Sequence, residues 1–103
     1  MAFVWDPVKD EENFHKHHIH FSTAELIFDD PLRIKRRDDD SSIAAERYQS
    51  IGVADAAFFV VYTEEGPEDT RLITARLATA KERRIYHGGT GTTYPYGWVR
   101  SDS

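Results

Sequence analysis

The sequence predicts a single α+β domain with two N-terminal helices, a mainly antiparallel sheet and one C-terminal helix. Helical apolar spacing with capping residues occurs near the start, strand-like alternation fills the middle, and another capped stretch follows the last expected strand. At 103 residues, 40% of them apolar and 30% charged, the chain can form one modest core. It has no room for a second catalytic domain.

The expected N-terminal elements are a short strand and two helices. The letters FVWD are typical of a strand, and Asp6 followed by proline is a good helix start, so we expect a helix from about Pro7 to His17. Ser22 and Glu25 have the spacing of a capping box, which predicts a second helix over STAELIF. That helix should end at the DDP sequence, because helical geometry is disfavoured before a proline.

The remaining expected elements are four strands and a helix. The strands are expected at Leu32 to Arg36, Arg47 to Val53, Ala57 to Thr63 and Thr70 to Arg76. Their short, turn-rich connectors favour an antiparallel meander. Thr79 and Glu82 again have capping-box spacing, and a Gly-Gly pair ends the helix. We therefore assign residues 1–87 to the folded domain and 88–103 to a flexible tail rich in Gly, Thr and Tyr.

Composition restricts the compartment and the partners. The chain has no cysteine, which excludes disulfides, thiolate nucleophiles and sulfur-rich zinc sites. Its start lacks the features of a signal peptide, and no apolar run approaches the roughly 20 residues of a membrane span, so we expect a cytoplasmic protein. The formal net charge is −5, so a nucleic-acid partner would need a local basic patch.

Several short sequences, taken in order, resemble one protein family. They are FVWDPVKDEENFHKHHIHF, FDDPL, ERYQSIG and TRLITARLATAKERRIYH, which extend from about Phe3 to His87. Together they resemble the BrnT family of type II toxins, small ribonucleases related in fold to RelE. The resemblance implies cleavage of RNA without a metal or other cofactor, which inhibits translation and growth. It also implies a BrnA-like antitoxin whose ribbon-helix-helix part binds operator DNA.

The first expected helix carries one group of candidate site residues. Metal-free RNA cleavage through the 2′-hydroxyl needs a base, an acid and cations around the phosphate. Lys9, Asn13, Lys16 and His17 fall within an arc of about 100° on this helix. We interpret Lys16 and His17, which lie on the KH of the family motif, as catalytic, and Lys9 and Asn13 as substrate-binding. The alternative is that both lysines are solvated and the other two side chains bond to backbone.

The last strand and helix carry the second group. Arg76 ends the strand and Arg83 lies one turn into the helix, so both guanidiniums could converge on one phosphate, and we interpret them as catalytic. Arg84 and Tyr86 beside them, with Arg71 on the strand, are candidate substrate-binding residues.

These candidates also have structural alternatives. For Arg76 and Arg83 the alternative is a solvated, salt-bridged helix end. Tyr86 is equally well explained by packing against the sheet. Arg71 alternates with Ile73 and Ala75, which predicts that all three share one strand face, so a partly buried structural arginine is its alternative.

The histidines of HKHHIH, residues 15–20, raise the possibility of a metal site. His15 with His18, and His17 with His20, have the i,i+3 spacing that can pair imidazoles on a helix. A third ligand and supporting carboxylates are not evident in the sequence, so we expect no metal site and only one working histidine, His17.

Acidic features favour an alternative function. The run Asp38 to Asp40, the net charge and Glu65, in a turn where the family tends to be basic, all repel RNA. The alternative is a catalytically weakened or inactive homologue that binds the antitoxin and takes part in transcriptional autoregulation.

Overall fold

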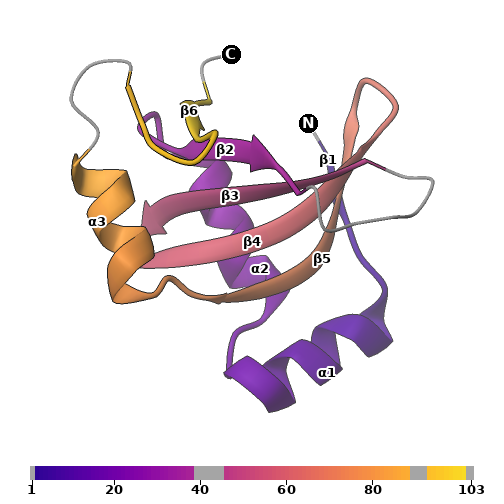
Figure 1. The fold of residues 1–103 in the computed structure, drawn as a ribbon. Coiled ribbons are helices and arrows are strands. Elements are labelled where there is room, and N and C mark those ends of the chain that lie inside the picture. The colour runs from indigo at the N-terminus through magenta and orange to yellow at the C-terminus, as the bar shows by residue number, and fades with distance from the viewer. Residues whose placement is uncertain (1, 39–45, 89–92, 102–103) are drawn as a thin grey trace.

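The computed structural model describes residues 2–38, 46–88 and 93–101 (Figure 1). In chain order its elements are β1 (Ala2–Val4), α1 (Pro7–His17), α2 (Phe21–Ala24), the 3₁₀ helix η1 (Glu25–Asp29), β2 (Ile34–Arg37), β3 (Arg47–Ala54), β4 (Ala56–Glu65), β5 (Asp69–Leu77), α3 (Ala80–Gly88) and β6 (Val99–Arg100). This confirms the α+β class. Asp39 and Asp40 of the acidic run, and Gly89 at the expected helix end, lie outside the described residues. No helix among the described residues is long and apolar enough to cross a membrane.

The strands form one sheet in the order β1-β5-β4-β3-β2-β6. The four central strands pair antiparallel in chain order, so the predicted meander is confirmed. At one edge β1 runs parallel to β5, with Ala2 opposite Asp69 and Val4 opposite Arg71. At the other edge β6 pairs with β2, with Ile34 opposite Arg100.

Each face of the sheet is covered by different elements. One cluster of buried residues joins α2 and η1 to the sheet, and its members are Ile19, Phe21, Ala24, Ile27, Phe58, Val60, Tyr62, Leu72 and Ala75. Gly52 of β3 permits this approach, because a Cβ there would lie 2.8 Å from the Cβ of Ile27. The second cluster joins α3 and the segment before β6 to the opposite face, through Ile34, Ile51, Phe59, Ala78, Tyr86 and Trp98.

Two of the three expected helix starts are confirmed. The Asp6 carboxylate accepts a hydrogen bond from Val8 N at 2.9 Å, and α1 has the predicted bounds. Thr79 and Glu82 form the expected capping box at the start of α3. The capping role predicted for Ser22 is wrong. The second helix begins at Phe21, since its backbone N–H donates to Asp10 Oδ1 at 2.7 Å, so α1 supplies the cap.

A β-bulge interrupts β5. The pairing with β4 changes register from Thr74 opposite Val61 to Leu72 opposite Tyr62, which leaves Ile73 as the extra residue. The expected alternation on this strand is therefore wrong beyond Ile73. Leu72 and Ala75, three residues apart, are both buried in the first cluster.

The strand near the C-terminus was not predicted from the sequence. Within the stretch assigned to a flexible tail, Val99 and Arg100 form β6, and Trp98 is 3% exposed in the second cluster. At least one aromatic residue of this stretch therefore docks on its own chain.

Candidate functional site

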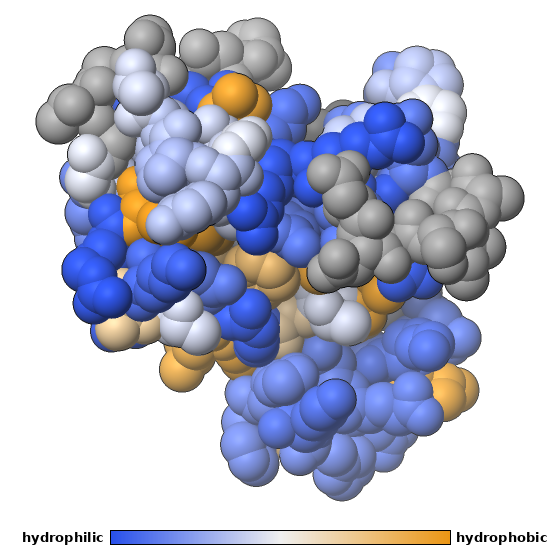
Figure 2. Space-filling view, in the orientation of Figure 1, coloured by the Kyte–Doolittle hydropathy of each residue, from blue (hydrophilic) through white to orange (hydrophobic). Residues whose placement is uncertain are grey.

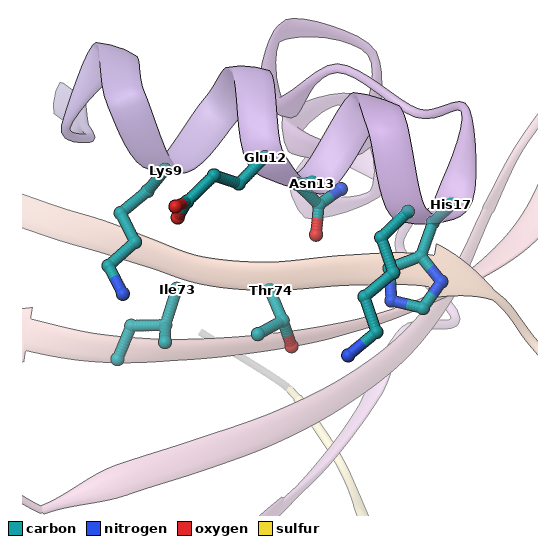
Figure 3. A pocket seen from close by; sticks show the side chains of 7 residues that line it. Lys9, Glu12, Asn13, His17, Ile73 and Thr74 are labelled. Carbon is teal, nitrogen blue, oxygen red and sulfur yellow. The ribbon is translucent and has the colours of Figure 1, made fainter.

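A pocket lies between α1 and the outer edge of β5 (Figure 3). Its volume is about 230 Å³, and it is lined by Lys9, Glu12, Asn13, Lys16, His17, Ile73 and Thr74. The α1 residues project from one side of the helix toward Ile73 and Thr74 (Figure 3). The pocket therefore opens beside the bulge, where the strand edge is irregular. The structure brings together all four residues predicted on this helix face.

Asn13 has a structural role in this pocket. Its side-chain Nδ2 donates to the carbonyls of Ile19 and Ala75, both at 2.8 Å, and its Oδ1 accepts from Ala75 N at 3.1 Å. The amide thus pairs with the free edge of β5 as a neighbouring strand would. Because both N–H groups are used inside the protein, Asn13 has no donor left for a phosphate. Its interpretation as substrate-binding is not supported, and the backbone-bonding alternative describes it.

His17 is half-buried at the end of α1, close to two cations. Burial lowers its pKa below the ordinary 6.5, and the positive charges of Lys16 and Arg76 lower it further. The imidazole is therefore mostly neutral at pH 7. Lys16 is exposed beside it. His17 and Lys16 line the same pocket, and Arg76 of β5 lies near enough for its charge to act on His17.

Arg76 is held in a fixed orientation by three neighbours. Its Nη1 and Nη2 donate to Glu82 Oε1 and Oε2 at 2.8 and 2.9 Å, and its Nη1 also donates to the Leu77 carbonyl at 3.2 Å. The guanidinium carbon lies 4.0 Å from the centre of the Phe59 ring. These bonds use three of the five N–H donors of the guanidinium, which leaves two.

Glu82 has more than the capping role assigned to it from the sequence. Burial alone would raise its pKa, but hydrogen bonds from Arg76 and the Thr79 backbone outweigh burial and lower it. The carboxylate is therefore ionised at neutral pH and reduces the net charge next to Arg76.

The other arginine candidates lie apart from the pocket. Arg83 donates to the Ala78 carbonyl at 3.0 Å, whereas Arg76 donates to Glu82. The two guanidiniums have different partners, so the predicted convergence on one phosphate stays a prediction. Arg84 is exposed and lines a different cavity, between α3 and the C-terminal segment. Arg71 pairs with Glu65 at 2.9 Å across the β4–β5 hairpin. It stands five residues from Arg76, which is about 16 Å along a strand.

Tyr86 connects α3 to the segment before β2. Its hydroxyl donates to Asp30 Oδ2 at 2.5 Å, and its ring is buried in the second cluster. Asp30 also accepts from Leu32 N and Val53 N, at 2.9 and 2.8 Å. Burial and the Asp30 carboxylate raise the pKa of Tyr86. The packing alternative describes Tyr86, and its interpretation as substrate-binding is not supported.

Three histidines of the HKHHIH stretch have local contacts. His15 lies 3.8 Å from Glu11, and His20 lies 3.2 Å from Asp10 and stacks on Phe14. His18 ends α1 in the left-handed conformation, with φ 60°. Within residues 2–38, 46–88 and 93–101, no three His, Cys, Asp or Glu side chains group in a way that could hold a metal ion.

Sequence reasoning missed Glu12 and Thr74 in the pocket. Glu12 stands three residues after Lys9 and four before Lys16, so helical spacing could have included it. Thr74 had no such signal, because its position depends on the bulge.

The fold and the pocket together define a small α+β protein with a cationic pocket that contains one neutral histidine, at the edge of its sheet. The comparisons specify the family. The model for "Ribonuclease toxin, BrnT, of type II toxin-antitoxin system" matches residues 5–82, and the chain belongs to this family. The predicted resemblance is confirmed, and membership of a type II system implies an antitoxin partner.

A solved structure shows the same fold. The ribonuclease toxin BrnT of Brucella abortus matches with a TM-score of 0.56 and 23% sequence identity, over 77% of this chain and 97% of that one. No curated protein sequence matches this chain significantly.

Proposed function

We propose that this chain is an endoribonuclease toxin that cleaves RNA without a metal ion. The 2′-hydroxyl attacks the adjacent phosphate, so the O2′–P bond forms and the P–O5′ bond breaks. The products are a 2′,3′-cyclic phosphate and a 5′-hydroxyl end. Cleavage of RNA inhibits translation and growth in the cytoplasm until a BrnA-like antitoxin, whose ribbon-helix-helix part binds operator DNA, covers the site.

The observation that carries this proposal is the neutral His17 next to two cations. A neutral imidazole can accept the 2′-hydroxyl proton at pH 7, and its lowered pKa favours that form. The Lys16 ammonium beside it is the donor for the leaving 5′-oxygen. Arg76, with two N–H groups still available, stabilises the charge that develops on the phosphate.

The remaining cations extend the path of the RNA backbone. Lys9 lies about two helical turns from Lys16 along the same pocket, where it can contact a neighbouring phosphate. Arg83 and Arg84 on α3 contribute charge at a greater distance. Arg71 takes the most distant position, on the hairpin side.

One observation favours a second candidate function. Glu12 lines the pocket and Glu82 pairs with Arg76, so two carboxylates reduce the positive potential around His17. A catalytically weak homologue that retains antitoxin binding and autoregulation would be compatible with this balance.

Cleavage of a labelled single-stranded RNA by the purified, antitoxin-free chain tests the first function. We expect EDTA-resistant cleavage with cyclic phosphate ends, and a loss of about 10²- to 10⁴-fold in His17→Ala. Leu32→Ala, an exposed position distant from the pocket in sequence, is the control for handling and folding. No cleavage by a folded wild-type chain, with or without ribosomes, would favour the second function.

A further inference from the structure

A second cavity lies between α3 and the C-terminal segment. Its volume is about 420 Å³, within the usual range for ligand pockets, and it is lined by Lys81, Arg84, Ile85, Gly88, Pro95 and Tyr96. In Figure 2 the pale residues of the C-terminal segment lie beside the blue, polar surface of α3 on the same side of the molecule. The family match ends at residue 82, so most of this cavity lies outside the shared part of the chain.

Tyr96 is presented to solvent by a strained turn. Trp98 N donates to the Pro95 carbonyl at 3.2 Å, and both central residues have positive φ, 60° at Tyr96 and 82° at Gly97. Such a turn favours Gly, Asn or Asp, and a bulky aromatic residue is strained there. The ring is nevertheless 65% exposed, so burial does not offset this strain.

The base of this turn is firmly held. Arg36 Nη1 donates to the Tyr96 carbonyl at 2.9 Å, and its guanidinium lies 4.5 Å from the centre of the Trp98 ring. Trp98 is buried in the second cluster. The fold therefore fixes the Tyr96 backbone, so contact with a ligand costs the entropy of side-chain rotation but not that of ordering a loop.

Cations surround the Tyr96 ring. Lys81 Nζ lies 5.0 Å from the ring centre, and Arg84 lines the same cavity as the ring. An exposed aromatic ring flanked by Lys and Arg is the arrangement that binds single-stranded nucleic acid, because a base stacks on the ring and the cations contact phosphates. A helical peptide would instead need several spaced apolar anchors, and the cavity offers only Ile85 and Pro95.

The cavity adjoins a second one that reaches Glu82, the partner of Arg76. An adjoining cavity of about 270 Å³ is lined by Thr79, Lys81, Glu82 and Tyr96 among others. Glu82 also bonds Arg76, whose charge reaches His17. A strand of RNA that passes Arg76 would therefore meet Lys81 and Tyr96 next.

We propose that the cavity between α3 and the Pro95–Trp98 turn is a base-binding subsite for single-stranded RNA, in which a nucleobase stacks on Tyr96 and Lys81 and Arg84 contact the flanking phosphates. The subsite rests on the proposed ribonuclease function and extends it. It gives the enzyme a fixed contact with a nucleotide beside the one that is cleaved.

Binding of a fluorescein-labelled oligodeoxyuridylate, measured by fluorescence anisotropy, tests the subsite separately from cleavage. This probe has no 2′-hydroxyl and cannot be cut. Tyr96→Asn removes the ring and suits the positive φ, so the variant should keep the wild-type melting temperature or exceed it. We expect it to bind at least about fivefold more weakly, while Tyr96→Phe and Leu32→Ala stay within about twofold of wild type.

The salt dependence gives a second readout. Lys81→Gln and Arg84→Gln should each reduce the slope of log affinity against log salt by about 0.7, the value for one phosphate contact on a single strand. A Tyr96→Asn variant that binds the probe as the wild type does would overturn the subsite. So would a wild-type chain that does not bind the probe, or a variant that weakens only the antitoxin complex.

Failure of the subsite and failure of the proposed function give different results. RNA cleavage that depends on His17 but not on Tyr96 removes the subsite alone. Tyr96-dependent binding of the probe by a chain that never cleaves RNA removes the catalytic proposal and leaves a nucleic-acid site.

Discussion

The two halves of β5, on either side of the Ile73 bulge, are held in different ways. Before the bulge, residues 69–71 pair with β1, and Arg71 meets Glu65 next to the turn of the β4–β5 hairpin, where the side chains are 44% and 46% exposed. An ion pair this exposed contributes little to stability.

After the bulge, a single side chain replaces the neighbouring strand. The amide of Asn13 pairs with Ala75, while Arg76 and Glu82 form a two-pronged ion pair that is 32% and 17% exposed. A strand edge closed by a strand has no space beside it, whereas an edge closed by one amide leaves room for a pocket. The difference shows how the same strand can present one arginine as a surface charge and another beside the candidate site.

The largest expected effect is the difference in RNA cleavage rate between variants that lack Arg76 and variants that lack Arg71. Arg76→Gln is expected to reduce RNA cleavage by about 10²- to 10³-fold, because the proposed mechanism uses this fixed cation to stabilise the transition state. Arg71→Gln should stay within about twofold of the wild-type rate, since its guanidinium lies on the hairpin. Single-turnover cleavage of the same RNA measures both. Equal losses in the two variants would show that only overall charge matters.

The Asn13 amide, which pairs with the half of β5 after the bulge, should contribute strongly to the stability of the fold. Asn13→Ala removes three hydrogen bonds and leaves the Ala75 backbone groups unpaired, so we expect a loss of about 3 kcal/mol in the free energy of unfolding. Val8→Ala, on the exposed side of the same helix, should change it by less than about 0.5 kcal/mol. Urea unfolding followed by circular dichroism gives both values. If Asn13→Ala lowers the free energy of unfolding no more than Val8→Ala does, the Asn13 amide does not stabilise this edge of β5.

The next effect in size concerns Tyr86, which anchors α3. This helix carries Glu82, the partner of Arg76. Tyr86→Phe removes the hydrogen bond to the Asp30 carboxylate and should cost about 2 kcal/mol at pH 7. Hydrogen bonds from Tyr86 and the backbone outweigh burial and lower the pKa of Asp30, so this stabilisation is present above its unfolded pKa and is lost as the pH falls through the folded value. Unfolding at pH 7 and near pH 3 tests this. A cost that stays constant over that range would contradict the proposed role of the carboxylate.

The smallest expected effect is an electrostatic change in the pKa of His17. Lys16→Gln removes a positive charge beside His17 and should raise the pKa of the imidazole, and Arg76→Gln should raise it as well. Arg71→Gln should leave it unchanged. NMR titration of the His17 ring protons measures the shift without any substrate. A pKa that responds equally to Arg71 and Arg76 would remove the distinction between the two halves of β5.

Local signals in the sequence predicted most of the fold. Asp6 before a proline gave α1 its correct bounds, and the Thr79–Glu82 capping box marked α3, because both depend on residues within one turn. The start of α2 was misplaced because its cap, Asp10, comes from another helix. The bulge at Ile73 had no local signal either.

The candidate site was predictable where helical spacing determines it. Lys9, Lys16 and His17 share a face in the structure as they do in the sequence. Asn13 and Tyr86 were interpreted by residue type, but their roles depend on backbone and carboxylate partners distant in the chain, Ala75 and Asp30. A single sequence contains no record of such partners.

The short strand β6 has a consequence for any shortened form of the protein. It pairs with β2 and occupies the hydrogen-bonding edge that would otherwise end the sheet. A chain truncated at residue 87, where the sequence alone would place the domain boundary, loses this strand together with Trp98. The bared edge offers unpaired backbone groups to another copy. We expect such a truncation to self-associate into edge-to-edge oligomers and, at higher concentration, to precipitate.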